Sequence, residues 1–197
     1  MNILLLGEKS NLLSDKLISA GHKIQITCDK ITLDMVQNYD FLISFGYRHI
    51  IKKDIIDKFI NKIINLHISL LPYNKGADPN LWSYLENTPK GVTIHYIDEG
   101  LDTGDIIVQK EVQDNVETDT LKTSYDRLIN EIVMLFNDNI EDILTGSIKS
   151  KKQHGNGSLH YLKDKEKFMS LLIENGYNTL VKNLIMGGGI IILMILI

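Results

Sequence analysis

The sequence has little cysteine and no surplus of positive charge. Its single cysteine, Cys28, excludes an intrachain disulfide, so a reducing compartment suits the chain and we expect a cytoplasmic protein. The formal net charge is −4, from 21 Lys and Arg against 25 Asp and Glu. Binding to a phosphate backbone requires clustered basic side chains, so this charge disfavours nucleic acid as a partner.

Targeting and membrane-spanning segments are also missing. The N-terminal run Met-Asn-Ile-Leu-Leu-Leu-Gly lacks the basic flank of a signal peptide and instead predicts a first strand. Residues 190–197 form a run of eight apolar side chains, whereas a helix needs about 20 to cross a bilayer. We therefore expect no membrane association.

What the sequence does contain is an alternation of strands and helices. Hydrophobic residues make up 44% and charged residues 23% of the 197 residues, which fits one globular domain of ordinary size. The patterns predict strands at 2–7, 22–27, 40–44, 63–70, 92–96 and 106–112, and helices at 10–20, 53–62, 81–85, 120–144 and 163–172. This alternation predicts an α/β fold with an open, mostly parallel, Rossmann-like sheet flanked by helices, and a site at the carboxyl ends of the strands.

Helix ends and faces can be predicted in the same way. Asp78 and Pro79 suit the N-cap and first positions of the helix at 81–85, and Asp119 or Thr120 suits the N-cap of the long helix. The inward face of the helix at 53–62 is expected to carry Ile55, Ile56, Phe59 and Ile60.

A polar cluster is predicted on the strand that contains Asn65-Leu-His-Ile-Ser-Leu-Leu-Pro72. Side chains of a strand alternate between its two faces, so Asn65, His67 and Ser69 share one face. An amide, an imidazole and a hydroxyl together are unusual in a packed core. A strand end that meets solvent would explain the same side chains equally well.

A second stretch strengthens the functional interpretation. The pattern Asn-x-His-x-Ser-Leu-Leu-Pro-x-x-x-Gly at residues 65–76 is followed by His-x6-Asp-x-Gly at residues 95–104. Together, in this order, they resemble the catalytic core of the folate-dependent formyltransferases. That family includes enzymes that act on glycinamide ribonucleotide, on methionyl-tRNA and on nucleotide-linked amino sugars. The resemblance covers residues 1–184 and implies the formyltransferase fold, which is Rossmann-like.

The resemblance implies three catalytic residues, Asn65, His67 and Asp102. Asn65 would donate a hydrogen bond to the formyl oxygen, where charge builds during transfer. His67 would donate a second hydrogen bond and relay a proton, and Asp102 would keep His67 charged. His95 matches a family position near the site, and Ser69 is expected to support it rather than act as a nucleophile. We expect no metal.

The resemblance also implies 10-formyltetrahydrofolate as formyl donor. Its pterin ring would be wrapped by Phe45, Gly46, Tyr47, Arg48, His49 and Ile50, and the loop with Asp98, Glu99 and Gly100 would close over it. Residues expected to bind the acceptor are Ser10, Asn11, Tyr73, Lys75, Gly76 and Trp82. Aromatic residues at helical spacing, such as Trp82 and Tyr84, are more often packed in a core. Glu8 would place a negative charge beside a bound phosphate, which disfavours glycinamide ribonucleotide.

The predicted function is therefore transfer of a formyl group from 10-formyltetrahydrofolate to an amino group, with a nucleotide-linked amino sugar as the favoured small-molecule acceptor. Alternatives are glycinamide ribonucleotide or methionyl-tRNA as acceptor, hydrolysis of the formylfolate, and a truncated, inactive product.

Three segments are expected along the chain. Residues 1–148 would form the catalytic domain, and 149–186 a C-terminal extension in which Gly155–Tyr161 resembles a loop of sugar formyltransferases. Residues 187–197 would form an apolar tail. That tail has two interpretations: the product of a reading-frame slip at Gly187–Gly189, or a strand buried in a homodimer.

Overall fold

The structure, a computed structural model, describes residues 1–195 and the side-chain burial of residues 1–189. The chain forms two compact units that alternate along the sequence. The first unit contains Met1–His67, Thr93–Gln109 and Ile132–Gln153. The second unit contains Ile68–Val92, Lys110–Glu131 and the rest of the chain from His154.

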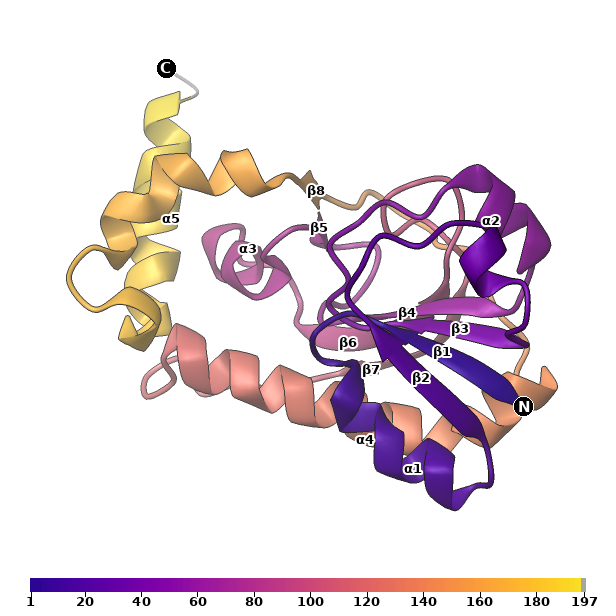
Figure 1. Cartoon of the computed structure of the whole chain (residues 1–197). Coiled ribbons are helices and arrows are strands. Elements are labelled where there is room, and N and C mark those ends of the chain that lie inside the picture. The colour runs from indigo at the N-terminus through magenta and orange to yellow at the C-terminus, as the bar shows by residue number, and fades with distance from the viewer. Residues whose placement is uncertain (196–197) are drawn as a thin grey trace. The chain divides into compact units, whose positions relative to one another are not determined.

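The main sheet has six strands in the order β2-β1-β3-β4-β6-β7 (Figure 1). The strands are β1 (Asn2–Leu6), β2 (Lys23–Thr27), β3 (Phe41–Ser44), β4 (Ile63–His67), β6 (Gly91–Tyr96) and β7 (Ile106–Glu111). β2, β1, β3 and β4 are parallel, and β6 runs antiparallel to β4. The predicted open, mostly parallel α/β sheet is thus confirmed.

Helices flank this sheet within the first unit. The helical elements are the short 3-10 turns η1 (Ser10–Leu13) and η2 (Asp34–Val36), the helices α1 (Ser14–Ser19) and α2 (Lys53–Lys58), and the C-terminal half of α4 (Leu121–Thr145). In Figure 1, α1 and α2 lie on opposite sides of the sheet. Apolar side chains of β1 and β3 pack with those of α2 in one buried cluster. This packing fixes the strand ends that carry the site.

One face prediction for α2 was partly wrong. Ile55 and Phe59 are buried as expected, and Ile56 is half-buried. Ile60, however, is 66% exposed. The helix ends at Lys58 rather than at residue 62, so the helical periodicity that would turn Ile60 inward stops before reaching it.

The second unit is built around a smaller helical core. Its elements are β5 (Lys75–Gly76), α3 (Pro79–Leu85), the N-terminal half of α4, β8 (Leu159–His160), the 3-10 segments η3 (Leu162–Leu172) and η4 (Gly176–Asn178), and α5 (Val181–Ile195). α3 packs against α5. The core contains Leu81, Trp82, Tyr84, Leu85, Leu121, Phe168, Val181 and Leu184.

The helix caps differ from expectation in one case. Thr120 caps α4, because its hydroxyl accepts the backbone N–H of Thr123 at 3.1 Å. Asp78 occupies the N-cap position of α3 but makes no capping hydrogen bond. It has a left-handed φ of 52°, and its carboxylate instead lies 2.8 Å from the Lys165 ammonium.

The C-terminal tail is helical as far as Ile195, so the expected alternative of a tail strand was wrong. Gly188 is buried and lies against Leu85 of α3, where an added Cβ would come within 2.9 Å of the Leu85 Cα. Residues 196 and 197 lie outside the described part of the chain. The origin of the tail and the boundary at residue 148 stay predictions. Within the described residues, no helix combines the length and apolar character needed to cross a membrane.

Candidate active site

The first two residues of the site, Asn65 and His67, lie on strand β4. Asn65 and His67 alternate with Leu66, which is buried in the core, so the two polar side chains share the other face. The strand ends at His67, so the alternation does not extend to Ser69 as expected. Ser69 is buried in the turn that follows, and its hydroxyl donates to the Tyr73 carbonyl at 2.8 Å.

Antiparallel pairing with β6 brings the second stretch to the same place. Asn65 lies opposite His95 in the register of the two strands. After β6 the chain turns through residues 97–105, and the Tyr96 N–H donates to the Asp105 carbonyl at 3.0 Å to close the loop. Asp102 lies in this loop with a left-handed φ of 53°.

The three predicted catalytic residues meet around the Asp102 carboxylate. Its Oδ1 accepts a hydrogen bond from Asn65 Nδ2 at 3.2 Å and lies 3.4 Å from His95 Nε2. Its other oxygen, Oδ2, lies 3.5 Å from His67 Nδ1. The side chains are 11% exposed for Asp102, 8% for His67 and 2% for His95. A carboxylate this sheltered from water interacts strongly with the nitrogens around it.

The hydrogen bonds fix the orientation of the two imidazoles. His95 Nδ1 lies 2.8 Å from the Tyr96 carbonyl, which can only accept, so this nitrogen carries a proton. His95 Nε2 lies 3.3 Å from Asn65 Nδ2. His67 turns Nδ1 toward the carboxylate, which makes Nε2 the ring atom suited to exchange protons with a substrate.

The loop at residues 45–50 follows β3, whose last residue, Ser44, pairs with Asn65. The predicted pterin segment therefore begins beside the catalytic strand. Phe45 is buried, and the Tyr47 hydroxyl donates to the Asp29 carbonyl at 2.8 Å and accepts from the Ile31 N–H at 3.0 Å. Burial raises the pKa of Tyr47.

The outer half of the same loop is exposed. Ile50 is 88% exposed, and the Arg48 guanidinium lies 3.3 Å from the Glu8 carboxylate, with both side chains largely in solvent. Gly7 has a φ of 104°, and an added Cβ would come within 2.5 Å of the Phe45 carbonyl oxygen. Only glycine therefore permits the loops after β1 and β3 to approach this closely.

The predicted folate-covering residues lie in the same loop as Asp102. The Asp98 carboxylate accepts the Gly100 N–H at 3.1 Å and the Thr103 hydroxyl at 2.6 Å. Glu99 forms an ion pair with Lys53 of α2. The hydrogen bonds of Asp98 link residues within the loop, and the ion pair of Glu99 links the loop to α2.

The predicted acceptor residues of the first unit differ in accessibility. Ser10 is fully buried, and its hydroxyl donates to the Leu6 carbonyl at 2.8 Å. A substrate contact by this side chain would require that bond to break, so its environment is that of a packed helix start. Asn11 is exposed, and its contact with an acceptor stays a prediction.

The remaining acceptor residues lie in the second unit. Lys75 and Gly76 form β5 and pair with Leu159 and His160 of β8, while Tyr73 is half-buried.

Trp82 is 5% exposed, and its ring stacks on His160 with a centroid distance of 3.8 Å. The ring face expected to stack on a nucleotide is thus in contact with His160. Binding of an acceptor by Trp82, as by Tyr73, Lys75 and Gly76, stays a prediction.

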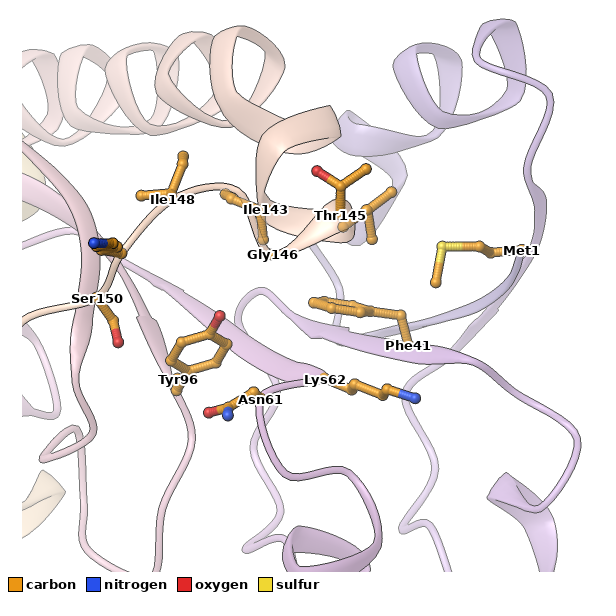
Figure 2. A pocket seen from close by; sticks show the side chains of 12 residues that line it. Met1, Phe41, Asn61, Lys62, Tyr96, Ile143, Thr145, Gly146, Ile148 and Ser150 are labelled. Atoms are coloured by element: carbon orange, nitrogen blue, oxygen red, sulfur yellow. The ribbon is translucent and has the colours of Figure 1, made fainter.

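A cavity of about 560 Å³ is lined by residues outside this cluster. Figure 2 shows the side chains that line it. Phe41 and Lys62 line it near the amino ends of β3 and β4, together with Tyr96 and the turn at Gly146. The carboxyl end of β4 carries His67, so the cavity and the polar cluster lie at opposite ends of the strands. The cavity therefore plays no part in the site described above.

Comparison with known proteins identifies the family. The Formyl transferase family model matches residues 27–137. The chain belongs to the formyl transferase family. It is 50% identical to the crystallised formyltransferase PseJ from Anoxybacillus kamchatkensis, over 93% of this chain and 97% of that chain, with a TM-score of 0.89.

Curated relatives match over shorter stretches. Methionyl-tRNA formyltransferase of Finegoldia magna is 36% identical over 120 residues, which is 60% of this chain and 38% of that protein. The dTDP-4-amino-4,6-dideoxyglucose formyltransferase of Mycobacterium bovis is 32% identical over 139 residues, which is 70% of this chain and 58% of that protein. The chain thus spans well under two thirds of the length of these relatives.

The sequence patterns missed one residue that contacts this site. Gln153 lies in the basic stretch at residues 149–154, where the sequence indicates only a solvated surface, yet its side chain reaches the Asp102 loop. No local motif marks it, because its contact depends on how the chain returns after α4.

Proposed function

We propose that the protein transfers a formyl group from 10-formyltetrahydrofolate to the amino group of a nucleotide-linked amino sugar. The main support is the likeness to PseJ at 50% identity over nearly the whole of both chains. That enzyme was crystallised with UDP-4,6-dideoxy-4-formamido-L-AltNAc and tetrahydrofolate. The sheltered cluster of Asn65, His67 and Asp102 supplies groups suited to this chemistry.

The residues of the first unit fit a formylfolate. Ile50 offers an exposed apolar side chain for a flat ring, and the backbone of the loop at 45–50 begins beside Asn65. Arg48 and His49 are exposed and can meet anionic groups. Bound there, the formylfolate would supply an activated formyl group.

The residues of the cluster suit the steps of transfer. The acceptor amine forms a bond to the formyl carbon, the bond from that carbon to N10 breaks, and one proton moves from the amine to N10. His67 would carry this proton on Nε2 while Asp102 holds Nδ1.

Negative charge builds on the formyl oxygen during the same step. The amide of Asn65, now 3.2 Å from Asp102 and 3.3 Å from His95, would turn one N–H to that oxygen. Asn65 would thereby stabilise the transition state more than the bound substrates.

A methionyl-tRNA acceptor is the second candidate, because relatives with that activity match at 36% identity. The net charge of −4 disfavours it, since tRNA binding gains much of its affinity from basic side chains.

The direct test is an assay of the purified protein with 10-formyltetrahydrofolate and a panel of acceptors. The panel holds UDP-linked and dTDP-linked 4-amino and 3-amino sugars, glycinamide ribonucleotide and methionyl-tRNA. Release of tetrahydrofolate together with a formylated sugar, detected by mass, is expected. Folate release without any formylated product would indicate hydrolysis, and formylation of methionyl-tRNA alone would overturn the sugar assignment.

A further inference from the structure

The chain returns to the catalytic loop after α4. Gly146, with a φ of 71°, ends the helix, and Lys151 then pairs with Ile106 at the start of β7. The Ile106 N–H donates to the Lys151 carbonyl, and the Lys151 N–H to the Ile106 carbonyl, both at 2.8 Å. This bridge places the segment of residues 148–153, called the strap below, beside the first residue of β7. The strap and Ile106 both belong to the first unit.

Gln153, at the end of this strap, holds the backbone of the catalytic loop. Its side-chain Nε2 donates to the Asp102 carbonyl at 2.8 Å and to the Gly104 carbonyl at 2.9 Å. Both amide hydrogens are thus used on two carbonyls that flank Thr103. These contacts join Gln153 to residues that lie 51 and 49 positions earlier in the sequence.

The loop needs such support. Asp102 has a left-handed φ of 53°, a strained conformation for a non-glycine residue that persists only where the surrounding structure imposes it. The position of Gly104 is restricted by close packing, since an added Cβ would come within 1.8 Å of the Tyr96 carbonyl oxygen. The direction of the Asp102 carboxylate follows from this backbone geometry.

Gln153 also carries an unsatisfied atom. Its Oε1 is buried and accepts no hydrogen bond from the described residues of the chain. A buried polar atom without a partner costs stability, so the two hydrogen bonds donated by Nε2, rather than packing, account for an amide at this position. A glutamine used only for packing has no reason to be preferred here.

We propose that Gln153 is a positioning residue, whose amide fixes the Asp102–Gly104 backbone and so aims the Asp102 carboxylate at His67. The expected effect of Gln153 on the reaction rate rests on the proposed formyl transfer. Its expected effect on the position of the Asp102 carboxylate rests on the geometry alone. Gln153 itself does not touch the reacting atoms.

The test compares Gln153→Met with the wild type. Methionine keeps the length of the side chain and removes both N–H donors together with the unpaired oxygen. We expect kcat for formyl transfer to fall about 10–100-fold, because small displacements of a catalytic group can cost about 10² in rate. KM for the acceptor should change little, whereas the melting temperature should fall modestly, because two loop carbonyls lose their donor. A merely structural role would lower the melting temperature but leave kcat, measured well below that temperature, at the wild-type value.

Gln37→Met is the matched control. Its amide donates to the exposed Asp34 carboxylate in the same unit, and this variant should retain full activity. An active wild type with an equally active Gln153→Met variant would overturn the positioning role.

A second readout does not depend on activity. The NMR signals of the His67 ring, compared at one pH, should move in Gln153→Met and stay unchanged in Gln37→Met. Unmoved His67 signals in Gln153→Met would overturn the inference even if no acceptor is turned over. Failure of the proposed function would show separately, as an inactive wild type whose His67 signals still respond to Gln153→Met.

Discussion

At the scale of single residues, the proposed mechanism depends on His67. Its Nδ1 lies 3.5 Å from Asp102, and in that mechanism Nε2 would move the proton. We expect His67→Gln to lower kcat by about 10²–10⁴, the usual contribution of general acid–base catalysis, while the protein still melts cooperatively. His154→Gln, at an exposed histidine, is the control and should keep full activity. Undiminished transfer by His67→Gln would contradict the mechanism.

A second residue-scale prediction concerns acid stability. Arg127 donates to both oxygens of Asp119 at 2.7 Å, and this pairing lowers the pKa of Asp119 to about 2. A carboxyl whose pKa is lowered on folding stabilises the protein above its unfolded pKa, and that contribution is lost as pH falls toward the folded value. The Asp119–Arg127 pair should therefore contribute fully at pH 7 and lose its effect between about pH 4 and pH 2.

Urea unfolding at several pH values measures this effect. Asp119→Asn should lower the free energy of unfolding by about 1.5–3 kcal/mol at pH 7, the usual range for hydrogen bonds to charged groups. The difference from wild type should shrink as the pH approaches 2. Asp126→Asn, which removes an exposed pair with Lys122, should cost less than about 1 kcal/mol at any pH. A difference for Asp119→Asn that is independent of pH would contradict this assignment.

The sequence predicts those residues of the candidate site whose positions follow from the geometry of a single strand. Strand alternation places Asn65 and His67 on one face, and the family resemblance adds Asp102. The same alternation fails at Ser69, because nothing in the residues themselves shows that β4 ends at His67. Local patterns do not identify Gln153, because its partners lie 51 and 49 residues away and become neighbours only through folding.

At the scale of elements, periodicity predicted every strand of the main sheet, and errors arose at helix ends. The helix expected at 53–62 stops at Lys58, and the tail, for which a strand was one of two interpretations, is helical as part of α5. Helix ends depend on tertiary contacts that compete with local preference, as when Asp78 pairs with Lys165 rather than capping α3.

The tail helix gives a prediction at this scale. A Cβ at Gly188 would meet Leu85, whereas one at Gly189 would have no atom within 4 Å. Gly188→Ala should therefore destabilise the protein through overpacking, which typically costs about 1–3 kcal/mol. Gly189→Ala should stabilise it by up to about 1 kcal/mol, because alanine is the better helix former. Thermal or urea unfolding of both variants measures the difference, and equal effects would contradict the packing of α5 on α3.

At the scale of the whole molecule, the fold class followed from sequence because alternating strands and helices permit few arrangements. The antiparallel insertion of β6 beside β4 was not predicted, and it places His95 beside Asn65. Strand order depends on contacts distant in sequence, which periodicity does not report. The division into two units that alternate along the chain has the same origin.

Binding of a folate should raise the melting temperature of the protein, and variants that reduce this rise identify where the folate binds. 5-Formyltetrahydrofolate at about 100 times its Kd should add about 2.7 kcal/mol to the free energy of unfolding. For a chain of this size that raises Tm by about 5–11 °C, at about 2–4 °C per kcal/mol.

Ile50→Asp, at a side chain 88% exposed in the unliganded protein, should leave the unliganded Tm unchanged and reduce the shift. His67→Gln should keep most of the shift, because in the proposed mechanism His67 would act on the formyl transfer rather than bind the pterin ring. If Ile50→Asp shifts as much as the wild type, the folate does not lie against the loop at residues 45–50.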